Sequence, residues 1–157
     1  MAANEKSTRS IFSDVRDTLG GLFGGKLDAK HEALIQGMFA LLGAMARADG
    51  VVSTEEAKFT NTLMDELKLS TRARQVATEA FALGCKREFD LDKEVLLLLS
   101  HFRRASEEVD RVYESLLRLA AADSMIRPGE RRFLEKMTLG LGFEPTELDV
   151  RLKRIMH

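Results

Sequence analysis

Two acidic residues recur in this chain at one spacing, and oxygen-bearing side chains of this kind could hold a divalent cation. The first stretch reads ARADGVVSTEEAKF and places Asp49 seven residues before Glu56. The second reads AAADSMIRPGERRF and places Asp123 seven residues before Glu130. Hard cations such as Ca²⁺ take several carboxylate and carbonyl oxygens. The four carboxylates, with Glu55 as a secondary member, therefore form a candidate metal site if the two stretches meet.

The same acidic residues also have a purely structural interpretation as helix-end residues. Ser53 and Glu56 match a capping box, in which the serine caps a helix and the glutamate bonds back to the cap. In the second stretch Arg127 stands at the position of Ser53, yet Glu130 is retained. A glutamate in the first turn of a helix still gains from the helix dipole. The sequence leaves both interpretations open, a shared cation site and a pair of helix ends.

Several residues weigh against a tight cation site. Met45 and Arg47 stand where an EF-hand loop needs its first ligands, so the first stretch is not a complete calcium loop. Arg127, Arg131 and Arg132 follow the second Asp closely and could neutralise it without a metal. Tight cation binding is therefore not expected. A divalent cation is the only cofactor that the sequence suggests.

Other catalytic and binding chemistry is sparse. Gly20 to Lys26 match the start of a phosphate-binding loop, but Leu27 replaces the required Ser or Thr and no strand precedes it. The chain has 24 Lys and Arg against 25 Asp and Glu, which gives a net charge of −1. This balance argues against a nucleic-acid partner. We expect a protein that is not an enzyme.

Hydrophobic periodicity predicts helices throughout the chain. Apolar residues recur at helical spacing in seven segments, and no strand pattern of useful length occurs. Ser70, Asp90 or Asp92, and Ser106 stand where helix N-caps are expected. The run EVLLLLSHF is apolar all round, which predicts a central buried helix. The predicted fold is all-α, with about seven helices built around two related helical hairpins that carry the repeated stretches.

The N-terminal segment differs from the rest. Residues 1–28 form a predicted flexible arm with an amphipathic part, since Ile11, Phe12, Val15 and Leu19 share one helical face, and with a glycine-rich part at residues 20–25. Residues 29–157 form the predicted helical domain. We expect peripheral membrane contact through residues 10–25. No apolar run is long enough for a transmembrane segment, so a cytoplasmic protein is expected.

Longer stretches of the sequence resemble a known family. The stretches are MFALLGAMARADGVVSTEEAKFTNTLMDELKLSTRARQVATEAFALG, FDLD, HFRRA and LLRLAAADSMIRPGERRFLEKMTLGLGF. Together they resemble the TerB-like (tellurite-resistance) helical domain, and most of all its version in DjlA-type, DnaJ-like membrane co-chaperones. The resemblance implies an all-α domain of about seven helices in a bacterial stress protein. It also implies divalent-metal chelation at the positions of Asp49, Glu56, Asp123 and Glu130.

The chain departs from the DjlA-type proteins in two respects. Those proteins carry an N-terminal membrane span and a C-terminal J domain with a His-Pro-Asp motif, and neither feature is found in this sequence. J-domain activity is therefore not expected. We expect a protein-interaction or regulatory module in stress response, whose partner is a second copy of the chain or chaperone machinery. The alternative is a divalent-metal-binding module that uses the paired Asp and Glu residues.

Overall fold

The computed structural model describes residues 16–17, 28–48, 54–121 and 125–156, without the side chains of residues 54–57 and 59. Its helices are α2 (Ala29–Arg47), α3 (Thr54–Glu66), α4 (Thr71–Gly84), α5 (Leu91–Leu99), α6 (Glu107–Ala120), α7 (Pro128–Gly140) and α8 (Glu147–Ile155). The described residues contain no strand. The predicted all-α fold is therefore confirmed.

Local sequence signals start several of these helices as predicted. The side chains of Ser70, Asp90 and Ser106 accept hydrogen bonds from the backbone N–H groups three residues ahead, at the starts of α4, α5 and α6. Asp28 caps α2 in the same way, with its carboxylate 2.8 Å from the N–H of His31. Because caps satisfy otherwise unpaired donors, these polar residues determine where the helices begin.

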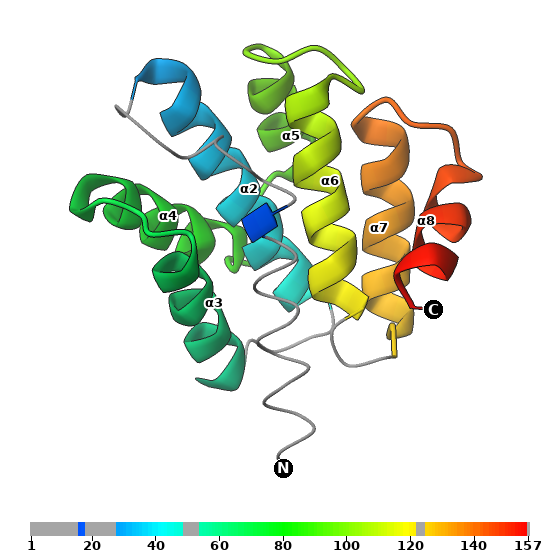
Figure 1. Cartoon of the computed structure of the whole chain (residues 1–157), viewed down its shortest axis with the longest axis horizontal. Helices are drawn as coiled ribbons and strands as arrows, with labels where there is room; N and C mark the ends of the chain where they lie inside the picture. The colour runs from blue at the N-terminus through cyan, green and yellow to red at the C-terminus, as the bar shows by residue number, and fades with distance from the viewer. Residues whose placement is uncertain (1–15, 18–27, 49–53, 122–124, 157) are drawn as a thin grey trace.

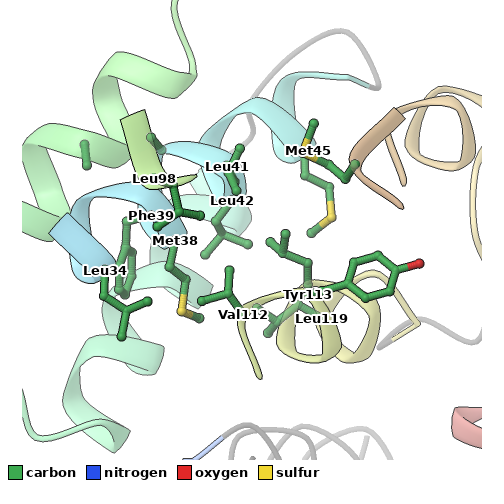
Figure 2. Packing of buried hydrophobic residues seen from close by; sticks show 14 of the residues in the cluster. Leu34, Met38, Phe39, Leu41, Leu42, Met45, Leu98, Val112, Tyr113 and Leu119 are labelled. Atoms are coloured by element: carbon green, nitrogen blue, oxygen red, sulfur yellow. The ribbon is translucent and has the colours of Figure 1, made fainter. Parts of the chain in front are cut away.

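The central helix of the domain is α2. Ten of its residues are buried, and it contacts α4, α5 and α7. Figure 1 shows α2 in the middle of the molecule, between α3 and α4 on one side and α6, α7 and α8 on the other. In the core, Met38, Leu42 and Met45 of α2 lie toward Val112, Tyr113 and Leu119 of α6 (Figure 2). The N-terminal part of the core thus meets the C-terminal part through α2.

The prediction that the EVLLLLSHF segment forms a central buried helix is wrong. In α5 the buried residues are Glu94, Val95 and Leu98, whereas Leu96 and Leu97 are 69% and 47% exposed. Four consecutive leucines point around the whole helix, but only one face of α5 meets another part of the described structure. An apolar residue on every face of a helix means that any face can be buried. Which face is buried depends on where the neighbouring helices pack.

The internal repeat extends beyond the predicted hairpins to three helices. With a shift of 74 positions, α2, α3 and α4 correspond to α6, α7 and α8, and α5 lies between the two sets. Contacts between α2 and α4 match contacts between α6 and α8. The ends of α3 and α7 also match, since Leu69 N–H bonds to Met64 O and Phe143 N–H bonds to Thr138 O. Such six-to-one bonds mark the same Schellman helix end in both halves.

Helices α2 and α4 cross at very short range. A Cβ atom added to Gly84 would lie 2.1 Å from the carbonyl oxygen of Ala40, and one added to Gly43 would lie 2.3 Å from the carbonyl oxygen of Phe81. Glycine at both positions therefore lets the two backbones touch. This crossing anchors α4 on the central helix and determines the position of the α4 C-terminus.

Candidate functional site

Most of the predicted metal ligands lie outside the described residues. Asp49 and Asp123 are in this group, and so are the side chains of Glu55 and Glu56, although both residues belong to α3. Only the side chain of Glu130 is described, at the start of α7. Within the described part of the chain, no three His, Cys, Asp or Glu residues come together as a metal-holding group. The proposed ligand set stays a prediction.

Glu130 has the structural role that its position predicts. Its Oε1 accepts a hydrogen bond of 3.3 Å from the backbone N–H of Arg127, the residue that precedes α7. Pro128 occupies the first helical position, where its missing N–H costs nothing. Glu130 thus makes the reciprocal half of a capping box without a serine partner. This bond explains why a glutamate persists where the second stretch has lost the cap hydroxyl.

Arg47, in the first repeated stretch, has a role that the sequence did not reveal. Its Nη1 donates a hydrogen bond of 3.0 Å to the carbonyl oxygen of Cys85, the residue that follows α4. Cationic side chains near a helix C-terminus satisfy its free carbonyls and favour its dipole. The C-terminal end of α2 is therefore tied to the C-terminal end of α4.

A charged cluster joins α6 and α8, and its centre is Arg151. Its guanidinium bonds to Asp110 at 2.6 Å, to Glu147 at 2.7 Å and to Glu114 at 3.1 Å. The buried Glu114 also pairs with Arg154, and it lies 3.5 Å from Arg118. Side chains of Arg151 and Glu114 are 11% and 9% exposed. This cluster holds α8 against α6, with the largely buried pair of Arg151 and Glu114 at its centre.

Aromatic rings complete the surroundings of Arg151. Its guanidinium carbon lies 5.1 Å from the centre of the Tyr113 ring and 5.0 Å from that of Phe143, within cation–π range. Those two rings stack with centres 4.7 Å apart. Burial acts to lower the pKa of Arg151, but hydrogen bonds to Asp110 and Glu147 outweigh it and raise that pKa above its usual value. The guanidinium is therefore a permanent charge with a structural role.

Tyr113 and Thr138 form a second buried polar contact beneath this cluster. Their hydroxyl oxygens are 2.5 Å apart, and Thr138 donates to the carbonyl oxygen of Leu134. Burial raises the pKa of Tyr113, while the bond to Thr138 acts against that rise. The phenol therefore stays neutral and joins α6 to α7.

Exposed leucines form the other notable surface. Leu96 and Leu97 on α5 and Leu139 on α7 are 69%, 47% and 54% exposed. The side chains of Asp92 on α5 and Lys136 on α7 form an ion pair of 3.3 Å, which places the two helices next to each other. Exposed leucines that lie on neighbouring helices are typical of protein contact surfaces.

No helix in the described part of the chain combines the length and the apolar character that a bilayer span needs. A search of solved structures gives no significant match. The family model described as "Tellurite resistance protein TerB" matches residues 35–152, which include all of α3 to α7, most of α2 and of α8, and both repeated stretches.

Curated relatives are named Co-chaperone protein DjlA. The protein from Vibrio vulnificus (strain YJ016) is 32% identical over 128 residues, which are 79% of this chain and 43% of that protein. The protein from Vibrio parahaemolyticus is 30% identical over 135 residues, or 85% and 48% of the two chains. The protein from Photobacterium profundum is 27% identical over 154 residues, or 94% and 53%. The chain thus spans about half the length of these relatives. Because the family model matches three helices of each repeat, the chain belongs to the tellurite resistance protein TerB family.

Proposed function

We propose that this TerB-family chain is a non-enzymatic module that binds a partner protein, and that it acts in bacterial stress response in a co-chaperone or tellurite-resistance context. The observation that carries the proposal is the exposure of Leu96, Leu97 and Leu139 on adjoining helices. The names of the DjlA relatives and of the family support the stress context. J-domain activity is no part of the proposal, since the sequence has no His-Pro-Asp motif.

The interaction role is tested by crosslinking in cells. A photo-crosslinking amino acid is placed at position 96, and in separate variants at position 150, where Val150 is 61% exposed on α8, and at position 83, where Leu83 is 39% exposed on α4. The crosslinked protein is identified by mass spectrometry, purified and tested for direct binding. We expect one defined partner with a measurable affinity. Absence of any specific crosslink from all three positions would contradict the interaction role.

A second candidate function is divalent-cation binding by Asp49, Glu56, Asp123 and Glu130, with Glu55 as a further ligand. The observation in its favour is that both repeated stretches keep the Asp-to-Glu spacing while the serine cap is lost in the second. Helix-end roles alone account for Glu130, whose Oε1 accepts the Arg127 N–H. The cation proposal therefore depends most on the two aspartates.

Thermal unfolding in EDTA and in excess Ca²⁺, Mg²⁺, Mn²⁺ or Zn²⁺ tests the cation proposal. A ligand at about 100 times its Kd stabilises a protein by about 2.7 kcal/mol, which for this size raises the midpoint by roughly 5–10 °C. That rise should vanish in the double variant Asp49→Asn/Asp123→Asn. Ser53→Ala is the matched control, because it removes a cap hydroxyl and should leave the rise intact. No rise with any of these ions would refute cation binding.

The proposed location is the cytoplasm, with membrane contact through residues 10–25. Of that segment, only Arg16 and Asp17 are among the described residues, and Arg16 pairs with Glu66 of α3 at 3.4 Å. Co-sedimentation of the protein with anionic vesicles, compared with a protein that lacks residues 1–25, tests the contact. Equal sedimentation of the two proteins would contradict it.

A further inference from the structure

Helices α5 and α7 lie side by side and run in the same direction. Asp92 pairs with Lys136 at 3.3 Å. One turn further along both helices, Val95 Cγ1 lies 3.6 Å from the place where a Cβ on Gly140 would be. The two contacts therefore join successive turns of α5 to successive turns of α7.

This register places two exposed leucines on one surface. Leu96 follows Asp92 by four residues, and Leu139 follows Lys136 by three, so each leucine lies one turn beyond the ion pair on its own helix. Their exposed fractions are 69% and 54%, which means that both turn outward rather than into the core. The surface that Leu96 and Leu139 share is called the α5–α7 face, and the exposed Leu97 follows next around α5.

Basic side chains surround the α5–α7 face. Lys93 precedes Leu96 by three residues, Lys136 precedes Leu139 by three, and Arg132 precedes Lys136 by four. Arg104 Nη2 donates to the carbonyl oxygen of Leu139 at 3.3 Å. Two acids lie at the face as well: Asp92 precedes Leu96 by four residues, and Glu135 precedes Leu139 by four. Four cationic groups against these two carboxylates leave the surroundings of Leu96 and Leu139 net basic, although the chain as a whole carries a net charge of −1.

We propose that the α5–α7 face binds an acidic amphipathic helix of a partner protein, whose leucine-like residues cover Leu96 and Leu139 and whose carboxylates meet the basic rim. This inference rests on the proposed interaction role and adds its surface and the chemistry of its partner. Opposite charge around an apolar centre guides association and determines register. A second copy of the chain is disfavoured as the partner, because two identical faces would bring Lys93, Arg132 and Lys136 against like charges.

The composition of the face favours a protein partner over a lipid surface. Lys93 lies one turn before both Leu96 and Leu97, and Ser100 lies one turn after both, so polar groups interrupt the apolar surface of α5. A helix that lies in a membrane interface needs a continuous apolar face to insert. Protein interfaces, in contrast, surround an apolar centre with a polar rim.

The test is a titration of the ¹⁵N-labelled full chain with two defined peptides, followed by NMR. Each peptide is a stapled helix of about 15 residues with one leucine stripe; one carries glutamates beside the stripe and the other carries lysines. We expect the acidic peptide to shift amide signals of α5 and α7, and the basic peptide to bind about tenfold more weakly or worse. Raising NaCl from about 50 to about 200 mM should weaken the acidic peptide several-fold, since the rim charges are screened.

Matched variants define the surface. Leu96→Gln and Leu139→Gln should each weaken the acidic peptide several-fold, while Val150→Gln, at an equally exposed position of α8, should leave the affinity unchanged. Equal binding of both peptides, no binding, or signal shifts centred elsewhere would overturn the proposal. Vesicles of phosphatidylglycerol, if bound in a manner that depends on Leu96 and Leu139, would also overturn it in favour of a lipid surface.

Failure of this inference can be told from failure of the interaction role. If the acidic peptide does not bind but crosslinking from position 150 or 83 still captures a defined partner, the interaction role stands and the α5–α7 face is the wrong surface. If no position captures a partner, the interaction role itself fails.

Discussion

At the scale of single residues, Glu94 is a carboxyl group placed where water scarcely reaches. Its residue is 7% exposed on α5 and faces α2. Burial raises its pKa above the ordinary value, while a hydrogen bond from Gln36 and the charge of Lys93 act in the opposite direction. A raised pKa in the folded state means that the ionised carboxylate costs stability.

We expect Glu94→Gln to stabilise the protein at neutral pH. The folded protein binds the Glu94 proton more tightly than the unfolded chain, so the cost is absent below the unfolded pKa of 4.5 and grows as pH rises through the raised folded pKa. The gain from Glu94→Gln should therefore be small near pH 4 and larger at pH 7. Urea midpoints across this range measure it, with Glu88→Gln in the exposed α4–α5 loop as the control. A gain that does not change with pH would contradict the assignment.

Lys68 is a second residue whose position carries a cost, because it has a left-handed backbone with φ of 53° at the end of α3. The matching residue of the second half is Gly142, with φ of 97°. A side chain in the left-handed region costs about 1–2 kcal/mol, whereas glycine tolerates it and loses about 0.5–1 kcal/mol to unfolded-state entropy.

Lys68→Gly should therefore stabilise the protein by about 0.5 kcal/mol. Lys68→Ala keeps the strained backbone and should give no such gain, which makes it the matched control. Gly142→Ala should destabilise, because its Cβ would also lie 2.7 Å from Arg104 Cβ. Chemical unfolding of the three variants measures these effects. Equal stability of Lys68→Gly and Lys68→Ala would show that the helix end is not strained.

At the scale of helices, the α2–α4 crossing depends on glycine. We expect Gly84→Ala to destabilise the protein by about 2–3 kcal/mol, as overpacking does in well-packed cores, because its Cβ would lie 2.1 Å from a backbone oxygen that cannot move freely. Gly140→Ala on α7 is the control, since its Cβ would meet only Val95 Cγ1 at an ordinary 3.6 Å. Thermal unfolding distinguishes them, and similar midpoints for the two variants would refute the close crossing.

At the scale of the whole molecule, the two halves hold their last helix by different means. With the shift of 74 positions, Ala40, Ala44, Ala77 and Ala80 of the α2–α4 contact correspond to Glu114, Arg118, Arg151 and Arg154 of the α6–α8 contact. Small residues let α4 approach the core backbone, whereas α8 is held by ion pairs and buries only Leu148 and Leu152. Helices with few buried apolar contacts open at lower free energy.

We expect α8 to open before α4 in native-state hydrogen exchange, and Arg151→Ala to lower the opening free energy of α8 further. Removing one partner of a buried pair costs about 3–5 kcal/mol, but Glu114 keeps Arg154 and Arg118 as partners, so about 2 kcal/mol is expected here. Lys153→Ala on the exposed side of α8 is the control and should change little. Equal protection of α8 and α4 would contradict this difference between the halves.

Some of these features could be predicted from the sequence because they depend on neighbours along the chain. Ser70, Asp90 and Ser106 cap helices that begin within a few residues of them, and Glu130 bonds to Arg127 three residues away. The candidate metal site is different, because its proposed ligands come from two stretches 74 positions apart. Whether they meet depends on tertiary structure around Asp49 and Asp123, which lie outside the described residues.

The sequence by itself determined the helical period, the helix starts, the 74-residue repeat and the TerB family, since each is written in local spacing or in residue identity. Only the tertiary structure decided that α2 rather than α5 is central, because four leucines in a row do not say which of them will find neighbours. The pairing of Arg151 with Glu114, 37 residues apart in the chain, is likewise visible only in the tertiary structure. Burial and ion pairing depend on what is brought close from elsewhere in the chain, and that information belongs to the packing of the helices.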